Sequence, residues 1–118
     1  MGELGDACRA AEADESVRAV IITGGKEYFS AGADLTEAMQ IKAPRDGVAF
    51  MKRWEVLNDI METLSKPVIA AIEGFCMTGG WEFVMACDIR VAAEGSTFAL
   101  TSSRIGTVPG AEIGRAHV

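Results

Sequence analysis

Glu82 is the residue of this sequence that is best placed to exchange a proton with a bound ligand. It closes the stretch CMTGGWE, residues 76–82, and follows Gly79 by three positions, which is about one turn of a helix. A ligand held at the backbone of Gly79 would then lie near its carboxylate. The residues alone leave two interpretations open: a general acid/base, or an acid that only complements the positive end of a helix.

A second stretch of small residues, FSAGADL at positions 29–35, precedes the first. Glycine and alanine let a ligand approach the main chain closely, so N–H groups from two such loops can converge on one carbonyl oxygen. Fixed donors stabilise negative charge that develops on this oxygen, and losing one costs roughly 3 kcal/mol of barrier. With a carboxylate nearby, this arrangement suits proton transfer next to a carbonyl. Taken separately, Gly79-Gly80 is more simply a tight turn, and Asp34 a helix cap.

Composition and charge narrow the range of ligands. The formal net charge of -6 argues against nucleic acid and membranes as partners, although backbone N–H groups can still bind a phosphorylated ligand locally. The glycines lack the spacing of a phosphate loop or a dinucleotide motif. The cysteines form no CxxC pair and stand beside no histidine cluster, so we expect buried thiols and no metal site: Cys8, Cys76 and Cys87.

Strands and helices must bring the two loops together. Apolar, β-branched runs predict buried strands at residues 17–23 and 67–72. A third strand is predicted at residues 89–93, and a short fourth at residues 97–100. Helical spacing of apolar residues predicts helices over residues 4–13, 48–65 and 81–86, and an Asp34–Glu37 capping box predicts another over residues 35–41. Residues 43–47 are expected to form a loop. This alternation predicts a layered α/β domain.

Three blocks in order resemble the enoyl-CoA hydratase/isomerase (crotonase) family: VRAVIITGG…FSAGADL, KPVIAAIEGFCMTGGWEFVMACDIRVAA and STFALTSSRIGTVPGA. The resemblance runs from about Leu4 to Ala111 and identifies the chain as a central fragment. It implies an α/β fold, the crotonase-like spiral of ββα units (ClpP/crotonase fold), truncated at both ends. It also implies subunits that pack as a homotrimer or hexamer.

The resemblance implies a site as well. The substrate would be an acyl-CoA thioester, with coenzyme A as part of the substrate and no separate cofactor. The backbone N–H groups of Ala31 and Gly79 would form the oxyanion hole, and Glu82 would be the general acid/base. The loops that hold substrate and coenzyme A would contain Phe29, Ala31, Ala33, Asp34, Leu35, Gly79 and Gly80.

One position departs from the family pattern. Family hydratases carry a second catalytic glutamate, which counting back from Pro109 places at Ser102, in a segment without an acid. Hydration of a 2-enoyl-CoA remains the favoured reaction. A double-bond isomerase that uses one glutamate is the alternative, and a non-catalytic acyl-CoA-binding homologue is the competing class.

Both ends of the chain are expected to be cuts. With a suitable choice of codons, residues 113–118 back-translate to a widely used sequencing adapter, so we expect an acyl-CoA domain core at 1–111 and a non-native tail at 112–118. A helix that starts almost at Met1 suggests an internal methionine. We expect a cytoplasmic, bacterial-type protein, with organelle targeting left open because the N-terminus reads as truncated.

Overall fold

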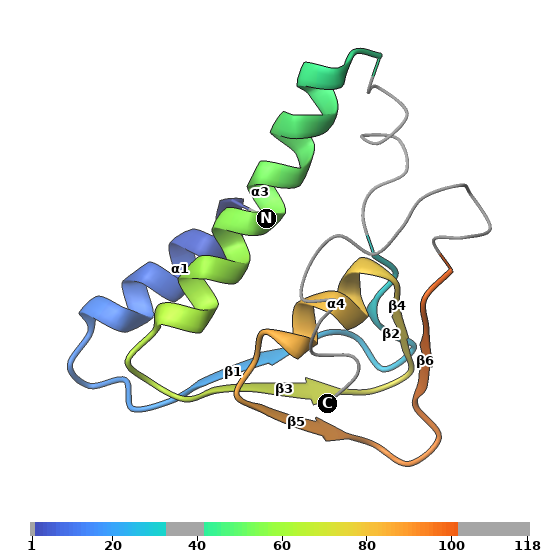
Figure 1. Ribbon diagram of the computed structural model, residues 1–118. Helices are drawn as coiled ribbons and strands as arrows, with labels where there is room; N and C mark the ends of the chain where they lie inside the picture. The colour runs from blue at the N-terminus through green and yellow to red at the C-terminus, as the bar shows by residue number, and fades with distance from the viewer. Residues whose placement is uncertain (1, 33–41, 102–118) are drawn as a thin grey trace.

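The computed structural model describes residues 2–32 and 42–101 (Figure 1). The elements follow in this order: α1 (Gly2–Ala13), β1 (Val20–Thr23), β2 (Tyr28–Ser30), α3 (Pro44–Thr63), β3 (Val68–Ile72), β4 (Phe75–Met77), α4 (Gly79–Met85), β5 (Ile89–Ala92) and β6 (Thr97–Ala99). None of the helices in these segments is long and apolar enough to cross a membrane.

The strands come in consecutive pairs, and the two members of each pair enter different sheets. The first members form one parallel sheet in the order β1-β3-β5, and the second members form another in the order β2-β4-β6. In Figure 1 the first sheet runs across the base of the molecule, and β4 and β6 rise from its end. The chain therefore advances as a spiral whose repeating unit is two strands and a helix.

Only one face of the first sheet is buried. On β3, residues Val68, Ala70 and Ile72 are buried, whereas the residues between them are half-buried. On β1, Ile21 is 66% exposed, so the prediction of a mostly buried strand was wrong for this face. Helices cover only the opposite, inner face of this sheet. The strand also begins at Val20 rather than Val17, because the N–H of Val17 bonds to Asp14 O in a turn.

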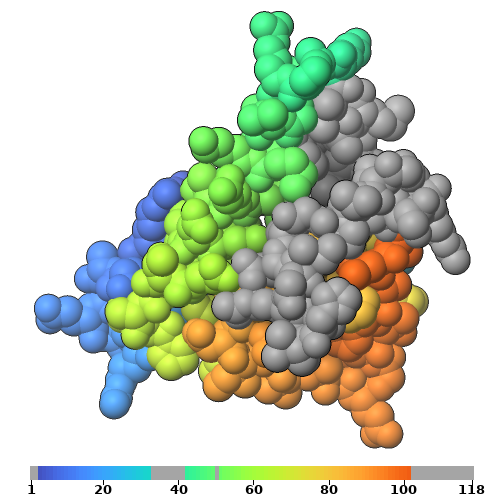
Figure 2. All heavy atoms as spheres, in the orientation of Figure 1, coloured from blue at the N-terminus to red at the C-terminus, as the bar shows by residue number. Residues whose placement is uncertain are grey.

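The core lies between the inner face of this sheet and the helices. It draws on every layer, since α1, α3, β3, β4 and α4 all contribute buried side chains: Cys8, Leu57, Met61, Val68, Ala70, Ile72, Cys76, Phe83, Val84 and Cys87. In the space-filling view α1 and α3 form one side of the molecule, and β5 and β6 form the other (Figure 2). The position of α4 is thus fixed by apolar packing on both sides.

The long helix α3 begins at Pro44, and the prediction of a loop at 43–47 was wrong. Proline at the first helical position already has a helical φ and loses no hydrogen bond there. The Asp46 carboxylate accepts hydrogen bonds from the N–H groups of Ala43 at 3.1 Å and Lys42 at 3.3 Å. These contacts satisfy backbone donors at the start of the helix.

Strand β2 contains Phe29 and Ser30, so the prediction of a loop at these residues was wrong. The strand has three residues and is defined by its parallel pairing with β4, in which Tyr28 lies opposite Phe75 and Ser30 opposite Cys76. A run this short carries no alternation that a sequence pattern could reveal. The helix predicted over residues 35–41 lies outside the described residues.

Candidate active site

The two glycine-bearing turns meet at one end of the second sheet. Because β2 and β4 are parallel neighbours, the segments that follow them leave the sheet at the same edge. Gly32 has φ 98°, and a Cβ atom placed there would lie 3.4 Å from Gly79 N and 3.3 Å from Met77 O. The backbones of the two turns are therefore in direct contact. Their spacing in the sequence could not reveal this contact.

Gly80 is needed for this contact. A Cβ atom at Gly80 would lie 2.6 Å from Ser30 Oγ, closer than two such atoms can approach. The missing side chain thus lets the start of α4 pack against the end of β2. The N–H of Gly32 in turn donates to Ser30 Oγ at 3.1 Å, so Ser30 joins both turns.

Helix α4 begins at Gly79, two residues before the predicted start at Trp81. The C=O of Thr78 accepts a hydrogen bond from the N–H of Glu82 at 2.9 Å and so points into the helix. In a trans peptide the N–H points opposite to the C=O. The N–H of Gly79 therefore points out of the N-terminal end of α4, where the helix dipole favours negative charge.

Ala31 and Gly79 carry the two N–H groups that are predicted to form the oxyanion hole. Ala31 directly follows β2, and Gly79 is the first residue of α4. They belong to turns in direct contact, and both lie at the same edge of the sheet. This arrangement brings the two backbone N–H groups to the same edge of the sheet.

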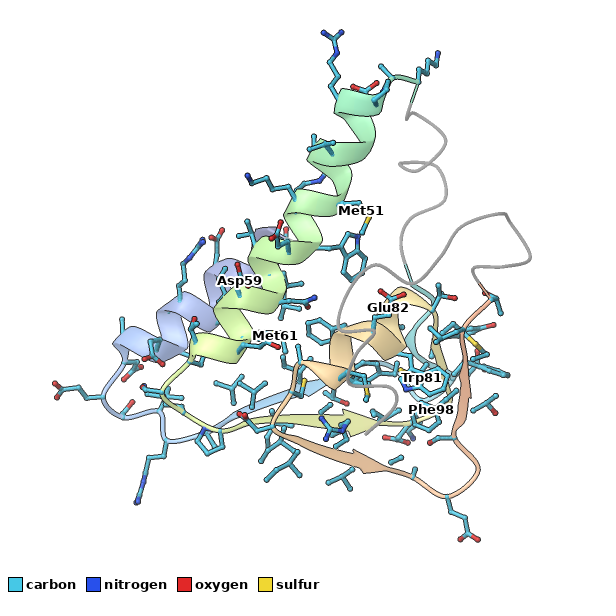
Figure 3. The ribbon with its side chains drawn as sticks, viewed as in Figure 1. Met51, Asp59, Met61, Trp81, Glu82 and Phe98 are labelled. Atoms are coloured by element: carbon cyan, nitrogen blue, oxygen red, sulfur yellow. The ribbon has the colours of Figure 1, made fainter. Side chains whose placement is uncertain are left out.

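Glu82 stands on the first turn of α4 and is half-buried. Figure 3 shows its side chain leaving the helix on the side opposite to Trp81. The Trp81 ring packs against Phe98 of β6, with 6.0 Å between ring centroids, and this contact fixes the rotation of the helix. At the other end of α4, the Arg90 guanidinium donates to Val84 O at 3.2 Å and Cys87 O at 2.7 Å. The helix that carries Glu82 is thus anchored at both ends.

Thr78 has a backbone conformation that the sequence did not predict. Its φ is 46° and its ψ is -107°, which is strained for a β-branched residue and costs on the order of 1–3 kcal/mol. Its hydroxyl oxygen lies 2.9 Å from Thr101 Oγ1 and accepts the N–H of Thr101 at 3.3 Å. A threonine before Gly-Gly is typical of an ordinary helix cap. No signal in the sequence therefore predicts the contact between Thr78 and Thr101.

The remaining predicted site residues divide into two groups. Phe29 is half-buried and packs against the core, where it supports β2. The other group lies outside the described residues: Ala33, Asp34, Leu35 and Ser102, together with the tail at 112–118.

One hollow that the described residues line lies elsewhere, between α1 and α3. It has a volume of about 430 Å³, and its lining includes Val56, Leu57 and Ile60 of α3. Neither the two turns nor Glu82 lines it. This hollow is therefore separate from the candidate site.

The cysteine thiols take no part in the site. Burial raises the pKa of Cys76 to about 11 and that of Cys87 to about 12, and it also raises the pKa of Cys8. Such thiols stay protonated at neutral pH and are poor nucleophiles. The expectation of buried structural thiols is confirmed.

Comparison with known proteins identifies the class of this fold. The chain superposes on the crystal structure of an enoyl-CoA hydratase/carnithine racemase from Magnetospirillum magneticum with a TM-score of 0.90 and 30% identity, over 98% of this chain and 44% of that one. The fold is therefore the crotonase fold, as predicted.

The sequence comparisons agree. A "Probable enoyl-CoA hydratase" of Bacillus subtilis (strain 168) is 40% identical over 108 residues, which cover 92% of this chain and 42% of that protein. The mitochondrial enoyl-CoA hydratase of Pongo abelii is 43% identical over 111 residues, which cover 92% of this chain and 37% of that protein. The chain thus spans about two-fifths of the length of these relatives.

The sequence model of the enoyl-CoA hydratase/isomerase family matches residues 1–116. The chain belongs to this family.

Proposed function

We propose that the protein containing this chain acts on an acyl-CoA thioester and, of the family's reactions, hydrates a 2-enoyl-CoA. One observation carries the proposal: Gly79 N lies against the Gly32 turn with its N–H directed out of α4, beside Glu82. The names of the relatives support the same substrate class.

The thioester oxygen would lie between the N–H groups of Ala31 and Gly79. During addition to the double bond, the electron pair of C2=C3 shifts toward the carbonyl, and the oxygen gains the charge of an enolate. Fixed backbone donors stabilise this charge more than they stabilise the neutral carbonyl, and so they lower the barrier. The positive end of α4 adds to the same effect.

Glu82 would move the proton. Its carboxylate takes a proton from water as the water oxygen forms a bond to C3, and the enolate forms at the thioester. The enolate then collapses, C2 takes up a proton, and the carboxylate ends in its starting state if it returns the proton that it took. The balance is one water added across C2=C3, with no oxidant or reductant.

A second reaction fits the same groups. A double-bond isomerase needs one base that removes a proton from the carbon next to the thioester or from C4 and returns it at the other position. The sequence favours this alternative at one point, since Thr101-Ser102-Ser103 contains no second acid. A non-catalytic acyl-CoA-binding protein is the third possibility, and it would keep the two turns while losing turnover.

Three further features belong to the same proposal. Coenzyme A would enter as part of the substrate and would be accommodated by residues 29–35, with no separate cofactor. The protein would assemble as a homotrimer or hexamer and would bind neither nucleic acid nor membranes. Its compartment would be the cytoplasm.

The test compares Glu82→Gln with Glu73→Gln in protein expressed from the complete reading frame. Both substitutions make the same chemical change, but Glu73 is exposed in the turn between β3 and β4. We expect Glu82→Gln to lower turnover roughly 10²-fold or more, with binding of coenzyme A nearly unchanged, and Glu73→Gln to behave as wild type. The assay follows the absorbance of the conjugated enoyl thioester.

The direction of the absorbance change separates the reactions. Loss of absorbance with a 2-enoyl-CoA indicates hydration, and a gain with a 3-enoyl-CoA indicates isomerisation. Equal turnover of wild type and Glu82→Gln would remove Glu82 from the mechanism. Binding of several acyl-CoA thioesters without turnover would favour the non-catalytic protein.

A further inference from the structure

We propose that Thr78 and Thr101 act as a hydroxyl pair that positions the N–H of Gly79 toward the thioester oxygen. The inference rests on the proposed function, because it concerns the donor assigned there. Both threonines are half-buried, and neither is required to touch the substrate, so they are positioning residues.

The conformation of Thr78 sets the direction of the Gly79 N–H. The ψ angle of Thr78 rotates the peptide that joins the two residues, and this peptide carries the donor. At φ 46° and ψ -107°, Thr78 lies outside the regions that β-branched residues favour. Relaxation of these angles would turn the peptide and move the N–H away from its present direction.

Contacts on three sides oppose this relaxation. The N–H of Thr78 donates to Ala99 O at 2.7 Å, at the end of β6, and its C=O accepts from Glu82 N–H at 2.9 Å. Its hydroxyl lies 2.9 Å from Thr101 Oγ1 and accepts from Thr101 N–H at 3.3 Å. The first two contacts use backbone atoms that any residue has, so the hydroxyl contact is what threonine adds at this position.

The hydroxyl pair also links the turn that carries the Gly79 N–H to the segment that follows Thr101. The choice between hydration and isomerisation depends on these two parts of the chain. Thr101 directly precedes Ser102 in the sequence, where family hydratases carry the second glutamate. The hydroxyl pair therefore ties the donor turn to the start of that segment. A change at Thr101 would reach the Gly79 N–H through Thr78, without altering the charge of any group.

The experiment compares Thr101→Val with Thr101→Ser in protein expressed from the complete reading frame. Valine keeps the shape and removes the hydroxyl, whereas serine keeps the hydroxyl. Two quantities are measured: kcat and KM with the enoyl-CoA substrate, and the stretching frequency of a ¹³C-labelled thioester carbonyl in bound acyl-CoA. The frequency falls when hydrogen-bond donors polarise the carbonyl, so it reports on the Gly79 N–H even without turnover.

We expect Thr101→Val to lower kcat roughly tenfold and to leave KM within about twofold, because the misplaced donor acts mainly in the transition state. The carbonyl frequency should move toward that of the free thioester. Thr101→Ser should restore both quantities, and the pH profile should keep its shape because no titrating group has changed. In a Thr78→Val/Thr101→Val double variant, kcat should fall no further than in the worse single variant.

The outcomes separate this inference from the function on which it rests. An unshifted carbonyl in bound wild-type protein would overturn both. A shifted carbonyl that is insensitive to Thr101→Val, or an equal loss in Thr101→Ser, would overturn the positioning role alone. Thermal unfolding of each variant shows whether the variant still folds. If Thr101→Val does not fold, kcat and the carbonyl frequency are compared between wild type and Thr78→Val, which removes the other hydroxyl of the pair.

Discussion

At the scale of single residues, type and spacing in the sequence suggest candidate site residues, whereas contacts between distant residues emerge only from the structure. Glu82 and Gly79 could be paired from their spacing in one helical turn. Thr78 could not be found, because its positive φ results from bonds to Ala99 and Thr101, which lie more than twenty positions away. The role of Gly80 likewise depends on Ser30, which the chain brings to it only through β2 and β4.

Gly80→Ala tests this contact. The added methyl group would overlap Ser30, so we expect the free energy of unfolding to fall by about 1–3 kcal/mol. Gly5→Ala is the matched control, because its Cβ would meet only Ile60 Cδ1 at 3.4 Å and alanine favours the helix α1. Urea denaturation measures both variants. Equal stability of Gly80→Ala and Gly5→Ala would show that the turns are not in contact as described.

For most helices and strands the sequence predicted the type of element, but it predicted less well the residues at which each one begins and ends. Apolar spacing predicted a helix over residues 48–65, but the first turn of α3 carries no such spacing and is set by Pro44 and Asp46. Strand β2 left no pattern at all, because three residues are too few to alternate. Periodicity reports how a segment packs, whereas its ends depend on hydrogen bonds of individual side chains.

Asp46→Ala tests the start of α3. We expect it to lower the free energy of unfolding by about 1 kcal/mol, because the N–H groups of Ala43 and Lys42 lose their acceptor. Asp59→Ala removes the same carboxylate from an exposed position far from the start of α3, four residues before its end, and should change stability by less than about 0.5 kcal/mol. Helicity and urea midpoint are the readouts. An equal effect of the two substitutions would contradict the capping role of Asp46.

For the whole molecule, alternating strands and helices predicted a layered α/β domain, but not which strands share a sheet. Two strands from each repeat could have paired with each other, and instead they enter separate parallel sheets. The pairing became predictable only through the resemblance to a family. One consequence is a single core that gathers cysteines from distant parts of the chain, namely Cys8, Cys76 and Cys87.

This core makes stability sensitive to alkaline pH. The folded-state pKa values of Cys76 and Cys87 are raised from 9.0 to about 11 and about 12, so the unfolded chain loses these protons first. Stability is unaffected by the thiols below pH 9 and falls as pH rises through the folded values, with each thiol contributing at most about 1.4 kcal/mol per pH unit. Urea denaturation between these pH values measures the slope, and Cys87→Ala should make it shallower.

Thiol titration provides the companion measurement. At pH 8 a chromogenic disulfide reagent should react slowly with all three cysteines of the folded protein and rapidly after denaturation. Fast reaction of any of them in the folded protein would show that the core is open at that position.

The central claim is that amides from two turns, at Ala31 and Gly79, bind one thioester oxygen beside Glu82. The most direct test is a crystal structure with an unreactive acyl-CoA analogue whose carbonyl replaces that of the thioester. We expect its oxygen about 3 Å from both nitrogens, with the Glu82 carboxylate facing the adjacent carbons. An oxygen that contacts neither amide, or a carboxylate turned toward bulk solvent, would contradict the claim.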